Sequence, residues 1–500
     1  MFLSPAYRGQ LDRFIFYPRF QINFTTVDLH VNDNYFEWAS VTGSRIGRFS
    51  HEDHGDPYPN RNPRCLQAQQ RKTRHLPCQH SRPRRPRPLG PSSVRARPAL
   101  ISLSSNNLSY ARLGAQLHWW EAYPVPKIAP APYNNPKEWG IVPAWGYARV
   151  LESRIPSIPV GAILWGFWPT GSHAVDVQLQ PLEPAGHWRE VSPQRSQLMS
   201  LYNGYIVHPA DRLDADEARP VVAGLTALAR PLFEAGHLLN YIFSKPGTHP
   251  YGFNGPWSAE DADLSTTAVV SLSAGTKTAR SFAWEMARNR DAAADGPRAL
   301  LQVTSVPDTL VASPPPTPEF EDAGGAKTLP PTRSVLYSGL RSGVEWVLES
   351  RPTRVVLLDF GVKPAVLLSA VDAIKTTAAA ADTEGVAVPQ VTIIAIGGES
   401  KVYSDAEMKV YASSIEALGK IPMNASDVRD RAIDALGPDD YFERLNEAWG
   451  RCVTEKGLGE LELLWFRGVE GEKGVDGAWQ ALCERRLAAN AGIVVRLDQE

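Results

Sequence analysis

Cysteine is scarce in this chain: its 500 residues include four, too few for a disulfide framework in a protein of this length. No run of about 18 apolar residues occurs, so no membrane span is expected. The first sixteen residues lack the charged start, apolar block and small-residue cleavage site of a signal peptide. These absences favour a reducing compartment, and cytoplasmic location is the expectation.

Acidic residues are absent from one long stretch. Between Pro57 and Trp120 there are twelve Lys or Arg and no Asp or Glu. The rest of the chain carries 40 basic and 54 acidic side chains, so the main body is acidic although the net charge is only −2. A nucleic-acid role could therefore reside only in the N-terminal arm, and we rank that role last.

Residues 1–98 are expected to form a poorly ordered arm, because the Arg- and Pro-rich stretch 57–98 cannot bury enough apolar surface to fold. Side chains of metal-binding types occur in the arm at His51, His54, Asp56, Cys65, His75, Cys78 and His80. The first three follow no strand or helix pattern, and the other four match the spacing of no common zinc module. Coincidence is favoured over a metal site, by roughly ten to one for residues 51–56.

From Ala99 the chain becomes a series of Gly- and Pro-punctuated alternating stretches, which predicts a compact β-rich module over 99–225. Residues 99–115 predict a strand followed by a turn, and 192–206 a helical or turn segment. A helix is predicted over 218–243. Beyond it, predicted strands at 266–271, 300–306, 335–340, 355–361 and 391–398 alternate with helices, notably 364–381. A Pro- and Gly-rich insertion at 313–332 is expected to be a mobile loop.

This alternation predicts an α/β fold with a doubly wound parallel sheet and helices on both faces. The chain is organised around its first strand and the turn that follows it, where Ser273, Gly275 and Thr278 occupy the positions of the dinucleotide fingerprint G-x-G-x-x-G. Only the middle glycine is kept, at the point where backbone approaches a pyrophosphate. Lys277 could add positive charge, but it follows Thr276 rather than glycine, so a P-loop is excluded. A plain strand–helix joint is an equally open interpretation.

Ligands of such sheets lie at the carboxyl ends of the strands. Small or polar residues stand at several of these ends, which favours a nucleotide site by about two to one. The predicted cofactor-binding residues are Ser271, Ser273, Ala274, Gly275, Thr276, Lys277, Thr278, Thr304, Ser305, Asp359, Gly361, Gly397 and Gly398.

Six motifs occur in order: NNLSYARLG at 106–114, WGFWPTGSH at 165–173, LYNGY at 201–205, RPLF at 230–233, SLSAGTKTA at 271–279 and LLDFG at 357–361. Together they resemble a divergent branch of the medium-chain dehydrogenase/reductase superfamily, known mainly from fungi and bacteria as a domain of unknown function. The resemblance covers about residues 99–420 and more loosely the tail. It implies a GroES-like module over 99–225, a Rossmann-type NAD(P)-binding domain over 226–420, and a helical segment over 421–500 that returns to the first module.

No Cys lies between 79 and 451, so the zinc ligands of metal-dependent members are missing and no metal is expected. The resemblance is closer to the zinc-independent quinone and enoyl reductases. By that resemblance Asn107 and Tyr110 face the nicotinamide, and Tyr110 donates a proton or hydrogen bond to a developing enolate. The equal alternative makes Tyr110 a buried strand residue.

A substrate pocket is implied beside Trp168, His173, Tyr202 and Tyr205; packing is the equal alternative for the tyrosines, and a core position is favoured for His173, which is predicted on a strand. The second parallel strand ends in Thr304 and Ser305 without the acid typical of NAD binding. NADP is therefore favoured slightly, although no Arg follows at once, and NAD stays open.

Two functional hypotheses follow. The first is an NAD(P)H-dependent, zinc-independent oxidoreductase that transfers hydride to an activated double bond or a carbonyl of a small molecule. The second is a non-catalytic binding or scaffold protein that retains a degenerate dehydrogenase fold, motivated by the incomplete glycine fingerprint. No membrane partner is expected, and a homodimer is left open.

Overall fold

A computed structural model describes residues 88–497, without 128, 130, 132, 137–138, 214–217, 253–256, 311–327, 383–387, 400, 402–406, 408, 411–412 and 414–416. The seven candidate metal ligands of the arm and most of the predicted mobile insertion lie outside the described residues. In the described part, no helix is both long and apolar enough to cross a bilayer.

A six-stranded parallel sheet contains the predicted strands and orders them as β12-β11-β10-β7-β8-β9. Its members are β7 (Thr267–Leu272), β8 (Ala299–Val303), β9 (Thr332–Val335), β10 (Arg354–Phe360), β11 (Gln390–Gly397) and β12 (Ile421–Pro422). The chain moves outward from β7 to β9, then returns to β10 beside β7 and continues the other way. This is the doubly wound 3-2-1-4-5-6 order, with its switch point between β7 and β10. The predicted Rossmann-type sheet is confirmed.

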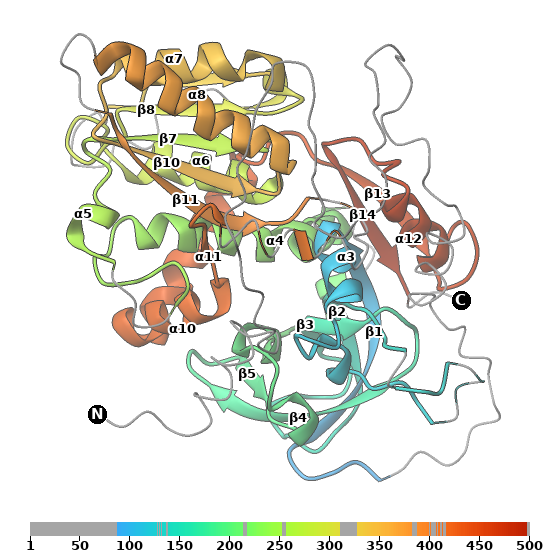
Figure 1. The fold of residues 1–500 in the computed structure, drawn as a ribbon. Helices are drawn as coiled ribbons and strands as arrows, with labels where there is room; N and C mark the ends of the chain where they lie inside the picture. Colours follow the sequence, from blue (N-terminus) through green and yellow to red (C-terminus); the bar gives the residue numbers. More distant parts are fainter. Residues whose placement is uncertain are drawn as a thin grey trace, which may run out of the picture. The chain divides into compact units, whose positions relative to one another are not determined.

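Helices cover both faces of the sheet (Figure 1). On one face α6 (Lys277–Asn289), α4 (Ala218–Ile242) and α11 (Pro438–Thr454) share a core with Val269 and Val356. On the other, α7 (Leu340–Glu349) and α8 (Pro364–Asp382) pack on Val270 and Leu357. Successive strand residues point to opposite faces, so a run of buried apolar residues such as β10 supplies both cores.

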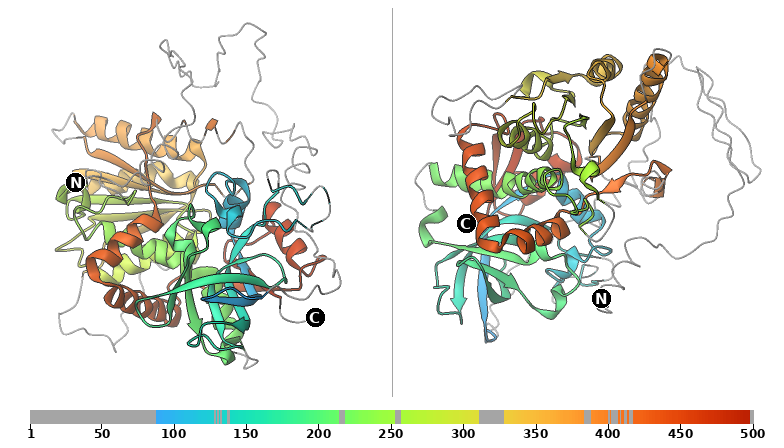
Figure 2. Two further views of the ribbon diagram at one scale, coloured as in Figure 1. Left: turned by 90° about the horizontal axis from the view of Figure 1, so that it is seen from below. Right: turned by 90° about the vertical axis from the view of Figure 1, so that its left-hand side faces the viewer.

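An eight-stranded, mainly antiparallel sheet forms the predicted β-rich module, in the order β13-β14-β1-β2-β3-β6-β5-β4. Its strands are β1 (Ser93–Leu103), β2 (Pro143–Ser153), β3 (Ile163–Pro169), β4 (Val175–Leu182), β5 (His187–Glu190), β6 (Gly204–His208), β13 (Glu462–Arg467) and β14 (Ala491–Arg496). Because β1 also pairs with β4, the sheet curls toward a barrel. Strand β14 lies against β1, red beside blue (Figure 2), and β13 pairs with the other edge of β14.

Shorter elements connect these sheets. They are the helices α3 (Ser105–Arg112), α5 (Ala259–Ala262), α10 (Ala425–Leu436) and α12 (Val475–Cys483), and the 3-10 turns η1 (Trp119–Glu121), η2 (Pro193–Arg195), η3 (Ser200–Asn203), η4 (Ala210–Leu213), η5 (Pro307–Thr309) and η6 (Tyr337–Gly339). The segment 421–500 divides: α10 and α11 join the parallel sheet's core, while β13, α12 and β14 join the antiparallel module.

Several predicted elements are corrected. The expected turn after the first strand is helix α3, which begins because Ser104 and Asn107 form a capping box. The predicted strand 335–340 ends at Val335 and continues as η6 and α7. His173 lies in the loop between β3 and β4 and not on a strand. β1 begins at Ser93, before the predicted module boundary, because Val94 and Ala96 alternate inward there.

Candidate functional site

The turn after β7 is built to hold backbone close to the carboxyl edge of the sheet. Ser273 adopts a left-handed conformation, with φ 61°, and its Oγ lies 3.2 Å from the hydroxyl of Tyr337. Thr276 caps α6 by accepting a hydrogen bond from the Ala279 N–H at 3.3 Å. The N-terminus of a 13-residue helix therefore opens at the switch point of the sheet, where its dipole favours an anion.

Gly275 is required by close packing against the second strand. A Cβ at this position would lie 2.8 Å from Thr304 Oγ1 and 3.2 Å from Val306 Cγ2. Thr304 is buried at the end of β8, and its Oγ1 accepts from the Val306 N–H at 3.3 Å. Because Gly275, the one fingerprint glycine that this chain retains, has no side chain, the β7–α6 turn can lie close to the end of β8.

Close packing of α6 onto α4 uses a glycine on the facing helix. A Cβ at Gly236 would lie 2.8 Å from the Phe282 nitrogen and 2.9 Å from the Thr278 carbonyl oxygen, and would also meet Ser281 Oγ. Thr278, at the third fingerprint position, is therefore compatible with tight helix packing. Gly236 thus permits the close α4–α6 contact beside Thr278.

Two cations follow this turn. Arg280, 7% exposed, donates to the Gly275 carbonyl at 3.0 Å and to Thr309 at its carbonyl and Oγ1, both 2.7 Å. Lys277 donates to the Ala491 carbonyl of the antiparallel module at 3.2 Å. Part of its side chain stays accessible, but the ammonium is densely surrounded. Burial, with a smaller effect from Arg280, lowers the pKa of Lys277 to about 8.

Some of the other predicted strand-end residues are buried and bonded within the fold, and others are exposed to solvent. Asp359 is buried; its carboxylate accepts from the N–H groups of Gly361 and Val362 at 3.0 Å and pairs with Lys420 at 3.2 Å. Gly361, with φ 99°, packs against the backbone of Gly398. Ser271 and Ala274 are buried, whereas Ser305 and Gly398 are exposed and Gly397 half-buried.

Tyr110 and Tyr202 belong to one aromatic cluster of the antiparallel module. Their ring centroids are 5.8 Å apart, and both contact Trp119 and Phe167. The Trp145 Nε1–H donates to the Tyr110 hydroxyl at 3.4 Å. Burial raises the pKa of Tyr110 above the ordinary tyrosine value, at which the hydroxyl is already protonated at neutral pH. Tyr202 is the less buried of the two tyrosines.

The remaining predicted catalytic and pocket residues make contacts of their own, and among them only the Tyr205 hydroxyl is described as reaching this cluster, by donating to the Phe167 carbonyl at 2.8 Å. Asn107 is 3% exposed; its Oδ1 accepts from the Ser104 N–H at 2.7 Å and its Nδ2 donates to the Pro143 carbonyl at 2.9 Å. Trp168 is fully buried and packs edge-on against Tyr205. Tyr205 in turn accepts from Arg195 at 2.9 Å. Burial lowers the pKa of His173 in its loop.

Helices that follow strands of the parallel sheet contact the antiparallel module at separate points. Besides Lys277 with Ala491, the Ser200 hydroxyl of η3 donates to Asp430 Oδ2 at 2.6 Å, and the Leu201 N–H donates to Ser426 Oγ at 3.1 Å. Ser426 and Asp430 lie on α10, which follows β12. These contacts place η3, and with it Tyr202, against the edge at which a doubly wound sheet binds its ligand.

The described residues contain no group of three or more His, Cys, Asp or Glu side chains that could hold a metal ion. The absence of zinc therefore stays an expectation for the whole chain.

A family described as a protein of unknown function (DUF2855) matches residues 101–488. The chain belongs to this family. The prediction from the six motifs that the chain belongs to a family of unknown function is thereby confirmed. No curated protein is a significant match to the chain.

Solved structures similar to this DUF2855 chain include CurA in complex with NADPH from Vibrio vulnificus, with 11% identity, TM-score 0.39 and coverage of 84% of this chain and 94% of that one. CurK enoyl reductase has 12% identity, TM-score 0.36 and coverage of 83% and 94%. The human synaptic vesicle membrane protein VAT-1 homolog-like protein has 10% identity, TM-score 0.35 and coverage of 83% and 92%. Likenesses this distant establish no activity.

Sequence reasoning missed Gly236, Arg280, Tyr337 and Lys420 in this DUF2855 site. A glycine inside a helix usually lowers helix stability, so Gly236 did not indicate a close helix contact. Arg280 lies in the first turn of α6, outside the apolar positions from which the helix was predicted. Lys420 precedes a two-residue strand, which gives no periodicity to detect.

Proposed function

We propose that this DUF2855 protein binds a nicotinamide dinucleotide and acts as an oxidoreductase. One observation carries the proposal. The backbone of Gly275 and the N-terminus of α6 lie at the switch point of a sheet with the strand order 3-2-1-4-5-6, and the antiparallel module contacts α6 there through the bond from Lys277 to Ala491. Gly275, Thr276 and Lys277 would hold the pyrophosphate. The hydroxyl-bearing end of β8, Thr304 and Ser305, would face the adenosine ribose.

NADP is the favoured form of the cofactor. No carboxylate stands among residues 303–306 to accept from ribose hydroxyls. Arg280 places a fixed positive charge beneath the loop after β8 through its bonds to Thr309, and Lys277 adds a second cation two residues from Gly275. Two cations beside a strand end whose first acid is Asp308, after Pro307, favour an additional phosphate electrostatically.

We propose hydride transfer to an activated double bond or carbonyl of a small molecule. The bound nicotinamide would supply the hydride. Tyr202 and the rings around it would offer an apolar wall for a conjugated substrate, and they would exclude water. The Tyr110 hydroxyl, which is protonated at neutral pH and whose pKa burial raises further, would donate a hydrogen bond to the oxygen on which negative charge develops.

A non-catalytic binding protein is the second candidate, and specific observations favour it. Both amide atoms of Asn107 are engaged within the module, Asp359 is paired with Lys420, and Trp168 lies wholly inside the core. A chain that had lost its chemistry would retain such contacts, since they support folding.

Titration of the purified full-length chain with NADPH and with NADH tests the first proposal. Enhanced nicotinamide fluorescence and a raised melting temperature are expected, with tighter binding of NADPH. Binding followed by NADPH oxidation in the presence of a panel of enones and quinones supports the enzyme. Binding without turnover of any member favours the second candidate, and no response to either nicotinamide overturns both the cofactor and the reaction.

A further inference from the structure

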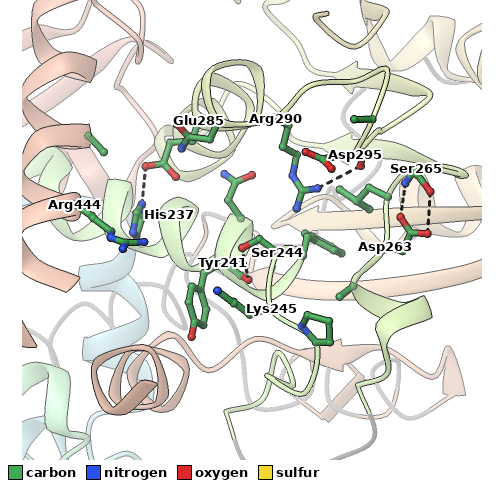
Figure 3. Close-up of a pocket in the computed structure, with 18 of the residues that line it drawn as sticks. His237, Tyr241, Ser244, Lys245, Asp263, Ser265, Glu285, Arg290, Asp295 and Arg444 are labelled. Atoms are coloured by element: carbon green, nitrogen blue, oxygen red, sulfur yellow. Dashed lines mark hydrogen bonds and ion pairs between the residues drawn. The ribbon is translucent and has the colours of Figure 1, made fainter. Parts of the chain in front are cut away.

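A cavity of about 700 Å³ at the C-terminal end of α6 is lined by side chains of both charges. Figure 3 shows Lys245 and Arg444 there together with Asp263 and Asp295. Because acids and bases are both present, this lining specifies neither an anion nor a cation as ligand. The outer edge of β13 is more specific, since its backbone groups and side chains together define a partner.

Strand β13 is the last strand of the eight-stranded sheet, and within the described part of the chain β14 is its one strand neighbour (Figure 1). The Glu462 N–H donates to the Asn490 carbonyl, at the start of β14, at 3.0 Å. Because the bonds of a parallel strand alternate in direction, the N–H and C=O groups of Leu463 and Trp465 point away from β14. They have no hydrogen-bond partner among the described residues. Such a row of groups is a template for one more strand.

The side chains of β13 do not protect this edge. Exposed sheet edges usually carry a charge or a proline near their centre, but here Glu462 and Arg467 stand at the two ends, with Leu, Leu, Trp and Phe between them. Trp465 is 40% exposed although its ring packs over Gly224 of α4, and Val221, one turn earlier on α4, is 49% exposed. Unpaired backbone and exposed apolar surface therefore lie at the same place.

The edge is complementary to a second copy of itself. In an antiparallel pair with its two-fold axis at Leu464, Leu463 of each copy lies opposite Trp465 of the other. Each opposed pair then exchanges its N–H and C=O groups, and the indole contacts the leucine across the strands. Antiparallel pairing also brings the acidic end at Glu462 toward the basic end at Arg467 of the other copy, which favours association.

The end of β13 selects this register. The Arg467 N–H donates to the Lys473 carbonyl at 2.6 Å, so the turn after β13 closes the edge at that point. An axis at Trp465 would set Leu463 opposite Arg467, whose N–H is already bonded. The axis at Leu464 instead uses all the outward groups of Leu463 and Trp465.

We propose that this chain forms a two-fold dimer in which the β13 strands of two copies pair antiparallel and join their eight-stranded sheets. Association uses no residue of the β7–α6 turn and none of the rings around Tyr202, so it does not depend on the proposed oxidoreductase activity. The strand pair is short, and small interfaces dissociate readily. The dimer is therefore reversible, with a dissociation constant on the order of micromolar.

Sedimentation equilibrium of the full-length chain over a concentration series in the micromolar range tests this dimer. A monomer–dimer equilibrium is expected. Trp465→Lys should raise the dissociation constant at least about tenfold, because it removes an aromatic contact and places a charge at the edge. Leu368→Lys, a matched change at a 52% exposed residue of α8, should leave the equilibrium unchanged.

A second variant is needed because Trp465 also packs on α4. Leu463→Pro removes an outward N–H and no bond to β14, and proline is tolerated on the open side of an edge strand. It should also weaken the dimer.

Hydrogen exchange of the native chain needs no variant: the Leu463 and Trp465 amides should exchange more slowly as the concentration rises. A monomer at every concentration, or a dimer that both substitutions leave intact, overturns the inference. Slow exchange of these amides in a monomer would mean that another segment of the same chain covers β13, which overturns it as well.

Discussion

Lys420 Nζ lies 3.2 Å from Asp359 Oδ2, and the two side chains are 2% and 3% exposed. The same carboxylate accepts from the N–H groups of Gly361 and Val362. One buried ion pair therefore joins the loop after β10 to the segment that enters β12. The sequence analysis predicted Asp359 as a cofactor-binding residue. In the structure its carboxylate oxygens are bonded to Gly361, Val362 and Lys420, and these bonds stabilise the carboxyl edge of the sheet.

Lys420→Met should destabilise the fold by about 3–5 kcal/mol, because it leaves Asp359 charged and buried without its partner. Urea unfolding measures the change. Lys456→Met is the control, since Lys456 and Glu460 form an exposed pair that contributes at most about 1 kcal/mol. Equal midpoints for the two variants would show that the buried pair contributes no more than a surface one.

Gly236→Ala should cost about 1–3 kcal/mol, because the added methyl group would overlap Ser281 and the α6 backbone. A methyl group added at Gly450, on α11, would meet no described atom within 4 Å apart from its chain neighbours and the adjacent backbone of its own helix. Gly450→Ala should therefore stabilise the protein by about 0.5–1 kcal/mol through helix propensity. Thermal unfolding of both variants compares them directly, and a neutral Gly236→Ala would refute the close α4–α6 contact.

Gly275→Ala should weaken NADPH binding at least tenfold, an order-of-magnitude expectation for loss of a phosphate contact. It should also strain the turn against Thr304. Adding Thr304→Ala removes the shorter of the two contacts, that with Thr304 Oγ1, and should restore most of the melting temperature. Affinity should stay low in the double variant, since the methyl group still covers the backbone. Full recovery of affinity would mean that Gly275 serves packing only.

NADPH affinity should fall as the pH rises through about 8, because Lys277 then loses its charge. Between this pKa and the value of 10.5 for a free lysine, the unfolded chain binds more protons than the folded one. Folding stability contributed by this residue should therefore rise with pH in the same interval, opposite to affinity. Lys277→Gln removes both slopes, and titrations at a series of pH values measure them. An affinity slope that persists in the variant would place the titrating group elsewhere.

The parallel strands could be predicted because each is a short apolar run bounded by turn residues. This pattern is the same whichever helices pack against the strand. Helix α3 could not, because Asn106, Asn107 and Ser109 are weak helix formers and the helix depends on its cap at Ser104. In the site, Gly275 could be predicted from its place after the strand.

Arg280 and Glu285 could not be predicted as buried groups. Helix α6 is covered by the sheet on one side and by α4 on another, so its buried positions do not form a single apolar stripe. The spacing of apolar residues predicts which face of a helix is buried. It does not predict the partners of a buried charge, because those lie on elements far away along the chain. Glu285 is paired with His237 of α4 in this way.

The pairing of β1 with β14 has a consequence for biosynthesis. Residues 100–103 align with 493–496, so β1 waits for one of its neighbours until residues 493–496 have left the ribosome. The parallel sheet, whose strands lie between them, can assemble earlier. Nascent chains stopped before Ala491 would leave an apolar strand edge uncovered, a ready target for chaperones and proteases.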